Sequence, residues 1–540
     1  MKFAELANYF EKLEATSSRL ALIDILAELF KDLKREEIDK VVYLTQGRVA
    51  PFFAPIEIGM ADKTVAGALA LVHGWGRVRV LEMYARMGDL GLVAKEMNQE
   101  VRVERQGVSV GDVFAILLEI AKTKGAGTVE KRLHLFSELI KRCDGKSVKH
   151  LVRIALGKAR LGVGDPTVLD AMALAFLGDR GKRKFLERAY NETSDLGLIG
   201  KTLLEGGLKE VEKLTVTVGR PIRSELCERL PSPEKIFEKM SKGDGVHATF
   251  KYDGFRVQIH KDGDRVSMFS RNLEDMTHMF PELIDGALKQ VKAKSAILDT
   301  EALAYRHDSE EFLPFQETTK RRRKYKIEEM AKSLPLKAFV FDILYKDGES
   351  LIDRPLVERM EILKRVVEKD DTLIPSYGKI LKSSKDLQLM LDDAISKGLE
   401  GVVAKRVDST YEAGGRNFNW VKLKRHSSGE LLDTIDCVIL GYILGKGKRT
   451  EFGAGALLVG VYDEKMDAFV TVSKIGTGLT DEEWRSIKER TKGLELDRKP
   501  ARVDSVIVPS VWVRPGIVIE VLADEITRSP VHTAGRILGP

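Results

Sequence analysis

Cysteine is scarce in this sequence. Cys143, Cys227 and Cys437 are the three cysteines among 540 residues, and no two of them form a CxxC pair. This spacing argues against a zinc ribbon or a disulfide framework and indicates a reducing compartment. No apolar run approaches the roughly 20 residues that span a bilayer, and the amino-terminal stretch MKFAELANYFEKLEA carries acids that a signal peptide would lack. We therefore expect a cytoplasmic protein with no membrane partner.

An excess of one charge is also missing. The 88 basic and 82 acidic residues leave a net charge of +6, so the whole chain is not a polycation. Positive charge is concentrated in KRRRKYK (Lys320–Lys326), which predicts either a solvated surface or a contact with phosphates. The hydrophobic content of 43% and charged content of 31% indicate a folded globular protein.

The length predicts a multidomain protein of about three domains, at roughly 100–200 residues each. Residues 1–215 show apolar spacing of three and four, as in LALIDILAELFKDL, and predict an all-α domain. Residues 216–424 alternate short strands with helices and predict an α/β (α+β) domain. Residues 425–540 hold short strands between Gly-rich turns, which predict a small β-barrel.

The segment HATFKYDGFRVQIHKDGDRV, at the start of the second domain, reads as strand, Asp253-Gly254 turn and strand, which predicts a hairpin. Lys261 and Lys346 also stand beside Asp-Gly, and both look like ordinary solvent turns. Taken alone, Lys251 would be a structural residue.

Other segments of the same domain change that interpretation. In NWVKLKR, Val421 and Leu423 alternate with two lysines that must share the opposite strand face. The domain also offers acidic, basic and aromatic residues on further strands, namely Glu301, Glu400, Arg271 and Phe341. Such a set suits a nucleoside triphosphate with a divalent metal.

These motifs resemble a known family. KYDGFR, SRN, LDTEALAY, FVFDILY, EGVVAK and WVKLK occur in the order of the covalent nucleotidyltransferase motifs. With NETSDLGLIGKTL and KARLGVGDPTVLDAMALAF in the helical part, the layout is similar to that of ATP-dependent DNA ligases of archaeal and eukaryotic replicative type. The resemblance covers nearly the whole chain. It implies a helical DNA-binding domain, an adenylation (nucleotidyltransferase) domain and an OB-fold.

The resemblance implies three steps. Lys251 attacks the α-phosphorus of ATP and becomes lysyl-AMP, the adenylate moves to the 5′-phosphate of a DNA nick, and the 3′-hydroxyl attacks that phosphate. Lys422 and Lys424 would neutralise phosphate charge during these steps. Mg²⁺ would be bound by Glu400 and also by Glu301, unless Glu301 contacts the ribose instead.

The remaining motif residues are assigned by the same resemblance. Phe341 would stack on adenine, and Asp253 would help position the nick and the metal. Arg256, Arg271 and Arg416 would contact ribose or phosphate. The partner would be nicked duplex DNA bound without sequence preference, by a monomer that associates with the nucleoid during replication and repair. A sliding clamp is a further partner that the family allows.

Two departures from the family bear on nucleotide choice and on the first step. The family usually has a glutamate two residues before the nucleophile, where it reads the adenine amino group, but this chain has Thr249. A hydroxyl both donates and accepts, so we expect weaker discrimination against other nucleotides. The family normally continues into a basic carboxy-terminal motif, whereas this sequence stops at Pro540. Either the sequence is cut short there or this member lacks the motif, and without it self-adenylylation should suffer most.

Alternatives remain at this point. An RNA ligase or an mRNA-capping guanylyltransferase shares the lysine chemistry, although such enzymes generally lack a large helical domain. An NAD-dependent ligase is disfavoured because metal-binding cysteines are missing. A catalytically idle nucleic-acid-binding protein with the same fold is the alternative of a different class.

Overall fold

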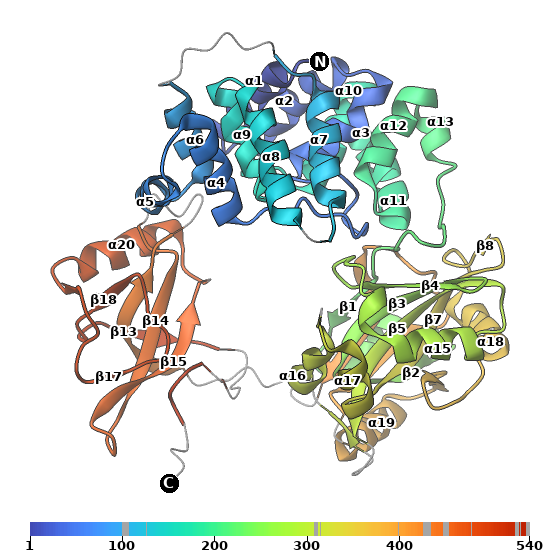
Figure 1. Ribbon diagram of the computed structural model, residues 1–540. Helices are drawn as coiled ribbons and strands as arrows, with labels where there is room; N and C mark the ends of the chain where they lie inside the picture. Colours follow the sequence, from blue (N-terminus) through green and yellow to red (C-terminus); the bar gives the residue numbers. More distant parts are fainter. Residues whose placement is uncertain are drawn as a thin grey trace. The chain divides into compact units, whose positions relative to one another are not determined.

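The computed structural model describes residues 1–99, 107–125, 127–306, 311–313, 315–323, 325–397, 399–424, 434–445, 453–476, 478–523, 529 and 531–535. The chain forms two compact units, Met1–Arg425 and His426–Pro540 (Figure 1). Within the described ranges, no helix is long and apolar enough to cross a membrane.

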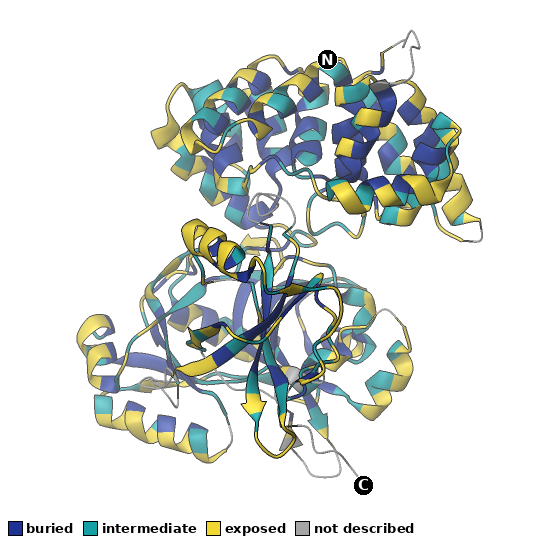
Figure 2. Cartoon of the chain, turned by 90° about the vertical axis from the view of Figure 1, so that its left-hand side faces the viewer, coloured by how far each residue is buried: buried dark blue, intermediate teal, exposed yellow. Residues whose placement is uncertain are grey.

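The first unit begins with a helical region, as the apolar spacing predicts. Its helices are α1 (Phe3–Glu14), α2 (Arg19–Lys31), α3 (Arg35–Thr45), α4 (Asp62–His73), α5 (Arg77–Met87), α6 (Leu90–Gln99), α7 (Val110–Lys122), α8 (Thr128–Lys141), α9 (Gly145–Ala155), α10 (Asp165–Leu177), α11 (Arg183–Thr193), α12 (Leu196–Gly206) and α13 (Leu208–Val211). Their apolar sides form one core, and Figure 2 shows buried residues inside the region and exposed residues outside. Ser109 begins α7 with a capping box, in which its hydroxyl accepts from Asp112 N–H and its own N–H donates to the Asp112 carboxylate.

The second region of the same unit, within residues 216–424, holds two sheets. One has the order β1-β12-β11-β2-β10, and the other has the order β4-β3-β5-β7-β8 with β6 on β5 and β9 on β7. The strands are β1 (Leu226–Arg229), β2 (Val246–Lys251), β3 (Phe255–Asp262), β4 (Arg265–Ser270), β5 (Ser295–Arg306), β6 (Glu311–Phe312), β7 (Leu336–Lys346), β8 (Glu349–Ser350), β9 (Leu373–Pro375), β10 (Lys379–Leu381), β11 (Gly401–Arg406) and β12 (Arg416–Lys424).

Helices cover these sheets. They are α14 (Pro233–Met240), α15 (Pro281–Gln290), α16 (Phe315–Thr318), α17 (Ile327–Ser333), α18 (Leu356–Val366) and α19 (Ser384–Ser396). Apolar residues of α14 and α19 share a core with β2, β11 and β12. Those of α15 and α18 share another with β3, β5 and β7.

The hairpin predicted across Asp253-Gly254 is wrong. β2 pairs with β10 and β11, whereas β3 pairs with β4 and β5, so the chain crosses from one sheet to the other at this point. A Cβ on Gly254 would lie 2.3 Å from the Ala302 carbonyl oxygen, so the crossing requires glycine because the backbones approach closely. The two comparison turns, after Lys261 and Lys346, are true hairpins between β3 and β4 and between β7 and β8.

The second unit is a curled, β-rich domain. Its strands are β13 (Ile435–Ile443), β14 (Ala456–Asp463), β15 (Ala468–Ile475), β16 (Glu495–Leu496), β17 (Val503–Asp504), β18 (Val511–Val513) and β19 (Val518–Val521). The sheet has the order β16-β18-β13-β14-β15-β17, with β19 paired to β13. Helix α20 (Asp481–Thr491) places Trp484, 1% exposed, in the core of this domain. Residues 536–540 lie outside the described residues.

A buried ion pair fixes α18 on β7. Arg359 donates from Nε to Asp342 Oδ1 at 2.8 Å and from Nη2 to Asp342 Oδ2 at 3.1 Å, and neither side chain has exposed surface. Arg359 Nη1 donates to the carbonyl oxygens of Arg354 and Ser409. Every ionised atom of the pair therefore has a partner, which is the condition for burying two charges.

We expect Arg359→Ala to destabilise the protein by about 3–5 kcal/mol, because Asp342 would lose its bidentate partner inside the core. Urea unfolding followed by tryptophan fluorescence measures this. Arg354→Ala is the control: its partner Glu349 is exposed, so the loss should stay below about 1 kcal/mol. Equal effects of the two substitutions would contradict this account of the pair.

Candidate active site

Three adjacent strands bring the lysines and one glutamate together. Gly401, the first residue of β11, lies opposite Lys251 on β2 and opposite Lys424 on β12. Glu400 therefore stands between the two lysines, and its two carboxylate oxygens pair with Lys251 Nζ and Lys424 Nζ. Gly401 has φ +151°, and a Cβ there would lie 2.1 Å from the Leu423 carbonyl oxygen, so glycine is needed for this placement.

A cavity of about 560 Å³ opens beside this group, between the two sheets. It is lined by ten of the residues predicted from the motifs, namely Thr249, Lys251, Asp253, Arg256, Arg271, Glu301, Phe341, Glu400, Arg416 and Lys422. Lys424 lies behind them and reaches the site through Glu400. The motifs thus converge on one site.

The two acids of the cavity have different environments. Burial raises the pKa of Glu301 to about 7 in spite of Lys251 and Arg256, and Glu301 has no hydrogen-bond partner among the described residues. Burial opposes ionisation of Glu400 as well, but Lys251 and Lys424 outweigh it and hold the pKa of Glu400 below its usual range. Carboxylate oxygens are the donors that Mg²⁺ prefers, so Glu301 and Glu400 fit a divalent cation.

The cations of the cavity also differ. Arg271, Arg416 and Lys422 have no carboxylate partner in the described part of the chain, and burial together with Lys424 lowers the pKa of Lys422. Arg256, in contrast, binds Asp299 through Nε (2.9 Å) and Nη2 (2.5 Å). It also donates from Nη1 to the Glu225 carbonyl oxygen at 2.7 Å. This geometry makes Arg256 part of the cavity wall more than a ligand contact.

Sequence reasoning missed the partners of this wall. The Tyr411 hydroxyl donates to Asp299 Oδ2 at 2.9 Å and accepts from Arg256 Nη2 at 3.2 Å. Trp420 packs edge-to-face on Phe341, with 5.9 Å between ring centroids. Asp299 could have been found, because it stands two residues before Glu301 on the same strand. Trp420 belongs to the WVKLK motif, but its packing on Phe341 was not predicted, and nothing in the polar stretch DSTYEAGG around Tyr411 indicates a role.

The basic run Lys320–Lys326 divides into different roles. Arg321 is 1% exposed and pairs with Glu282 at 2.5 Å, so it is a structural residue. Arg322 lines the cavity and pairs with Glu274. Lys324 lies outside the described residues. The Asp253 carboxylate, on the other side of the cavity, accepts from Phe315 N–H at the start of α16.

Comparison with known proteins identifies the family. The family models "DNA ligase N terminus", "ATP dependent DNA ligase domain" and "ATP dependent DNA ligase C terminal region" match residues 2–173, 224–424 and 450–538. A "Probable DNA ligase" of Dictyoglomus turgidum is 47% identical over 538 residues, which cover 100% of this chain and 91% of that protein. The chain belongs to the ATP-dependent DNA ligase family.

Further matches agree with this assignment. A "DNA ligase 2" of Thermofilum pendens is 40% identical over 546 residues, 99% of this chain and 90% of that protein. The solved structure "Pmar-Lig_Pre." has the same overall fold, with a TM-score of 0.53 at 14% identity over 97% of this chain and 95% of the other. The predicted three-part fold and the DNA ligase activity with ATP are confirmed. The predicted domain boundaries and residue roles stay predictions.

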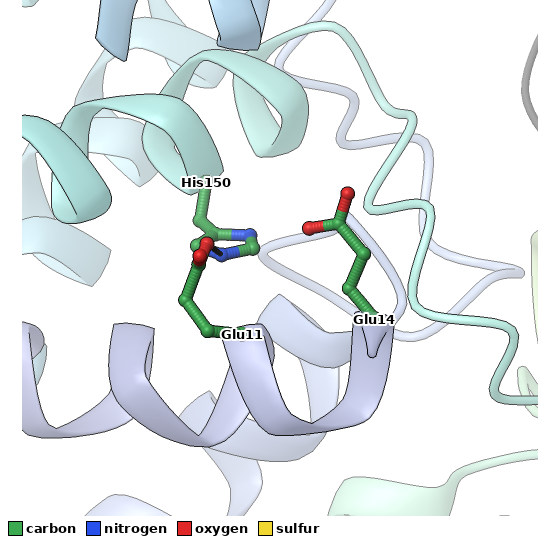
Figure 3. A group of neighbouring side chains, drawn as sticks. All are labelled: Glu11, Glu14 and His150. Carbon is green, nitrogen blue, oxygen red and sulfur yellow. Dashed lines mark hydrogen bonds and ion pairs between the residues drawn. The ribbon is translucent and has the colours of Figure 1, made fainter. Parts of the chain in front are cut away.

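A second acidic group in this ligase lies in the helical region. Figure 3 shows Glu11 and Glu14 of α1 beside His150 of α9, and their ligand atoms lie within 4.8 Å of one another. Lys149 pairs with both acids, and Arg153 binds Glu14 and Asp89 at 2.8 Å. Burial lowers the pKa of His150 to about 4, so this histidine is neutral. A metal would have to displace two buried cations, so the group is an ionic joint between α1 and α9.

Glu225 is an unusual buried residue of this ligase, next in sequence to Leu226 of the cavity lining. Its side chain is fully buried, its Oε2 accepts from Glu412 N–H at 3.0 Å, and its Oε1 is buried without a hydrogen-bond partner among the described residues. Burial raises the pKa of this carboxyl to about 8. Glu225 is therefore a neutral acid at pH 7.

We predict that Glu225 makes stability depend on pH. In the unfolded chain it titrates near 4.5, and in the folded protein near 8, so between these values the folded state holds one more proton and stability falls as pH rises. The fall is at most about 1.4 kcal/mol per pH unit. Glu225→Gln should lose less stability than the wild type between about pH 5 and about pH 8 in urea unfolding. Glu228→Gln, on β1 just after Glu225, is the control, and parallel curves for wild type and Glu225→Gln would refute the prediction.

Proposed function

We propose that Lys251 is the nucleophile with which this DNA ligase takes AMP from ATP. Three features support this role: its side chain lines the cavity, it is paired with Glu400, and Lys422 and Lys424 stand on β12, across β11 from it. Attack forms a bond from Nζ to the α-phosphorus and releases pyrophosphate. A protonated amine cannot attack, so the ion pair with Glu400 opens and Lys251 gives up a proton first.

The unpaired cations are assigned to the phosphates. Arg271, Arg416 and Lys422 line the cavity without carboxylate partners in the described ranges, so their charge is available to the triphosphate and later to the DNA end. Each of the three steps is an in-line displacement at phosphorus, in which positioning and charge stabilisation dominate. One set of cations can therefore serve all three steps.

Glu301 and Glu400 are the residues that would hold Mg²⁺, which when bound would neutralise charge on the triphosphate. Glu400 can bind the cation only after its two carboxylate oxygens release Lys251 and Lys424. Glu301 has no such partner in the described part of the chain and is open to a cation or to a ribose hydroxyl.

Base recognition is assigned to Phe341 and Thr249. Phe341 lines the cavity and is braced by Trp420, so its ring can stack on adenine. Thr249 is 3% exposed, lines the same cavity and has no hydrogen-bond partner among the described residues. Its hydroxyl is available to the base but cannot exclude a guanine oxygen as a carboxylate would.

Asp253 is assigned to help position the DNA nick and the metal beside Lys251. Its carboxylate holds α16 at the cavity mouth, beside Arg322 of the basic run. We assign the grip on duplex DNA, independent of sequence, to the helical region and the β-rich domain. The monomeric state is likewise a prediction from the family. A sliding-clamp partner and association with the nucleoid remain predictions from the family.

We expect Lys251→Ala to abolish labelling of the protein by α-labelled ATP, because the amine assigned to attack the α-phosphorus is removed, while Lys422 is assigned to the phosphate charge. The label on the wild type should be acid-labile and alkali-stable, as a phosphoramidate is. Lys346→Ala is the matched control, since Lys346 also precedes Asp-Gly but lies in a hairpin. Persistent label in Lys251→Ala would overturn the assignment.

The same variant separates the steps. Lys251→Ala should still seal a nick whose 5′-phosphate already carries AMP, since the last step needs no lysyl-AMP. Label from GTP or NAD instead of ATP, or a preference for RNA ends, would favour the other nucleotidyltransferases over a DNA ligase.

We expect Thr249→Glu to sharpen the choice of nucleotide. A carboxylate accepts from the adenine amino group and repels the guanine carbonyl, so the GTP-to-ATP labelling ratio should fall on the order of tenfold. Thr249→Val, which removes the hydroxyl without adding an acceptor, is the control and should not lower the ratio. An unchanged ratio in Thr249→Glu would show that another residue reads the base.

A further inference from the structure

A second cavity, of about 300 Å³, lies in the first unit between the helical region and the nucleotidyltransferase region. From the helical side it is lined by Tyr43, Gln46, Pro51, Phe52, Asp165, Tyr190, Ser194 and Leu196. Arg223 of the connecting segment and Arg271, Asn272 and Leu273 after β4 complete it. Arg271 and Asn272 also line the cavity of Lys251, so the two cavities share a wall.

Direct contacts hold the two sides of this cavity together. Phe53 packs edge-to-face on Phe269 with 6.3 Å between centroids, and Arg223 Nη2 donates to Asp165 Oδ2 at 2.6 Å. The turn that carries Arg271 is closed by hydrogen bonds, with Leu273 N–H donating to the Ser270 carbonyl oxygen at 2.8 Å. The cavity is therefore built by packed elements on both sides.

The charge of the cavity favours an anion. Asp165 is its acid, and that carboxylate is already bound by Gln46 at 3.0 Å, by the Tyr190 hydroxyl and by Arg223. Arg271 has no carboxylate partner in the described part of the chain, so one positive charge is left over. Beside it, Phe52 is 43% exposed, and Arg48 lies over its ring at 3.8 Å from the centroid.

We propose that this second cavity binds the DNA strand that carries the 5′-phosphate, just beyond the nick. Arg271 would contact a backbone phosphate, and Phe52 would pack on the sugar or base next to it. The volume is at the lower end of the roughly 300–1,000 Å³ of small-ligand pockets and suits about one nucleotide. An aromatic side chain beside cations is a usual means of holding a single strand without sequence preference, and the strand is interrupted at the nick, where its terminal nucleotide can be reached from the side.

The choice of strand follows from the shared wall and rests on the proposed function. The 5′-phosphate has to reach the adenylate on Lys251, and Arg271 lines the cavity in which this happens. The rest of that strand therefore leaves past Arg271 and Asn272, where the second cavity begins. Phosphates recur along one strand about every 3.4 Å of helix axis, so the next ones lie within reach.

Binding of nicked duplex DNA with a pre-adenylated 5′-phosphate tests the aromatic contact. Phe52→Ala should weaken binding about tenfold in fluorescence anisotropy, the size of one lost stacking contact. Labelling by ATP should be unchanged, because Phe52 does not line the cavity of Lys251. Phe185→Ala is the matched control: Phe185 is 40% exposed and has Lys184 over its ring at 5.1 Å, but it does not line this cavity. Equal affinities of the two variants would overturn the proposal.

A methylphosphonate scan tests the strand and the charge. One phosphate at a time is neutralised along the 5′-phosphorylated strand, along the 3′-hydroxyl strand and along the template. Neutralising one of the first phosphates beyond the nick on the 5′-phosphorylated strand should lower the affinity of the wild type for DNA. The affinity of Arg271→Gln should not change when that same phosphate is neutralised. A fall only on another strand, or additive losses at every position, would refute the proposal. Failure of the wild type to accept label from ATP would instead refute the proposed function and leave this binding test intact.

Discussion

The Glu400 carboxylate, held between Lys251 and Lys424, is the interaction on which the rest of the site depends. It exists because Gly401 faces both lysines across two antiparallel pairings, and a side chain at Gly401 would collide with β12. The buried strands β2 and β11 set that register through residues such as Val246, Ala248, Val402 and Ala404. A slip of one residue would turn Lys251 to the other face, so the core below the sheet fixes the chemistry above it.

The crossing at Asp253-Gly254 then brings the second half of the site into reach. Because β2 and β3 lie in different sheets, the residues that follow Lys251 turn directly toward Glu301 and Phe341 on β5 and β7. In a hairpin, β2 and β3 would pair with each other in one sheet, and Lys251 would lie beside residues of β3 instead of between the two sheets. Gly254 permits the crossing by its close contact with β5, and Asp253 gains a second task by holding α16 at the cavity mouth.

Much of this could be predicted from the sequence. Apolar spacing revealed the helical region and the strands, and the ordered motifs predicted that Lys251, Glu301, Phe341 and Glu400 would meet. Local spacing could not tell the crossing from a hairpin, since both begin with strand and Asp-Gly. Nor could it show that Arg256 is bound by Asp299 and Tyr411, because those residues are distant in sequence and long-range partners leave no periodic signal. Arg321 is a similar case, since its burial against Glu282 depends on how two helices pack.

In this ligase, basic residues that stabilise the fold differ from those available to bind phosphate in whether their hydrogen-bond donors already have acceptors. Arg153 and Arg359 are buried and Arg256 is partly buried. Acids and carbonyl groups accept hydrogen bonds from all three, so a phosphate could bind them only by breaking existing bonds. Arg271, Arg416 and Lys422 have no acidic partner among the described residues and line a cavity. An unpaired cation in a half-open site binds phosphate at little cost, whereas a buried paired one costs several kcal/mol to expose, roughly 3–5. In the run Lys320–Lys326, Arg321 is buried against Glu282 and Arg322 is paired with Glu274. The number of basic residues therefore says less about DNA binding than the count of those left without an acid.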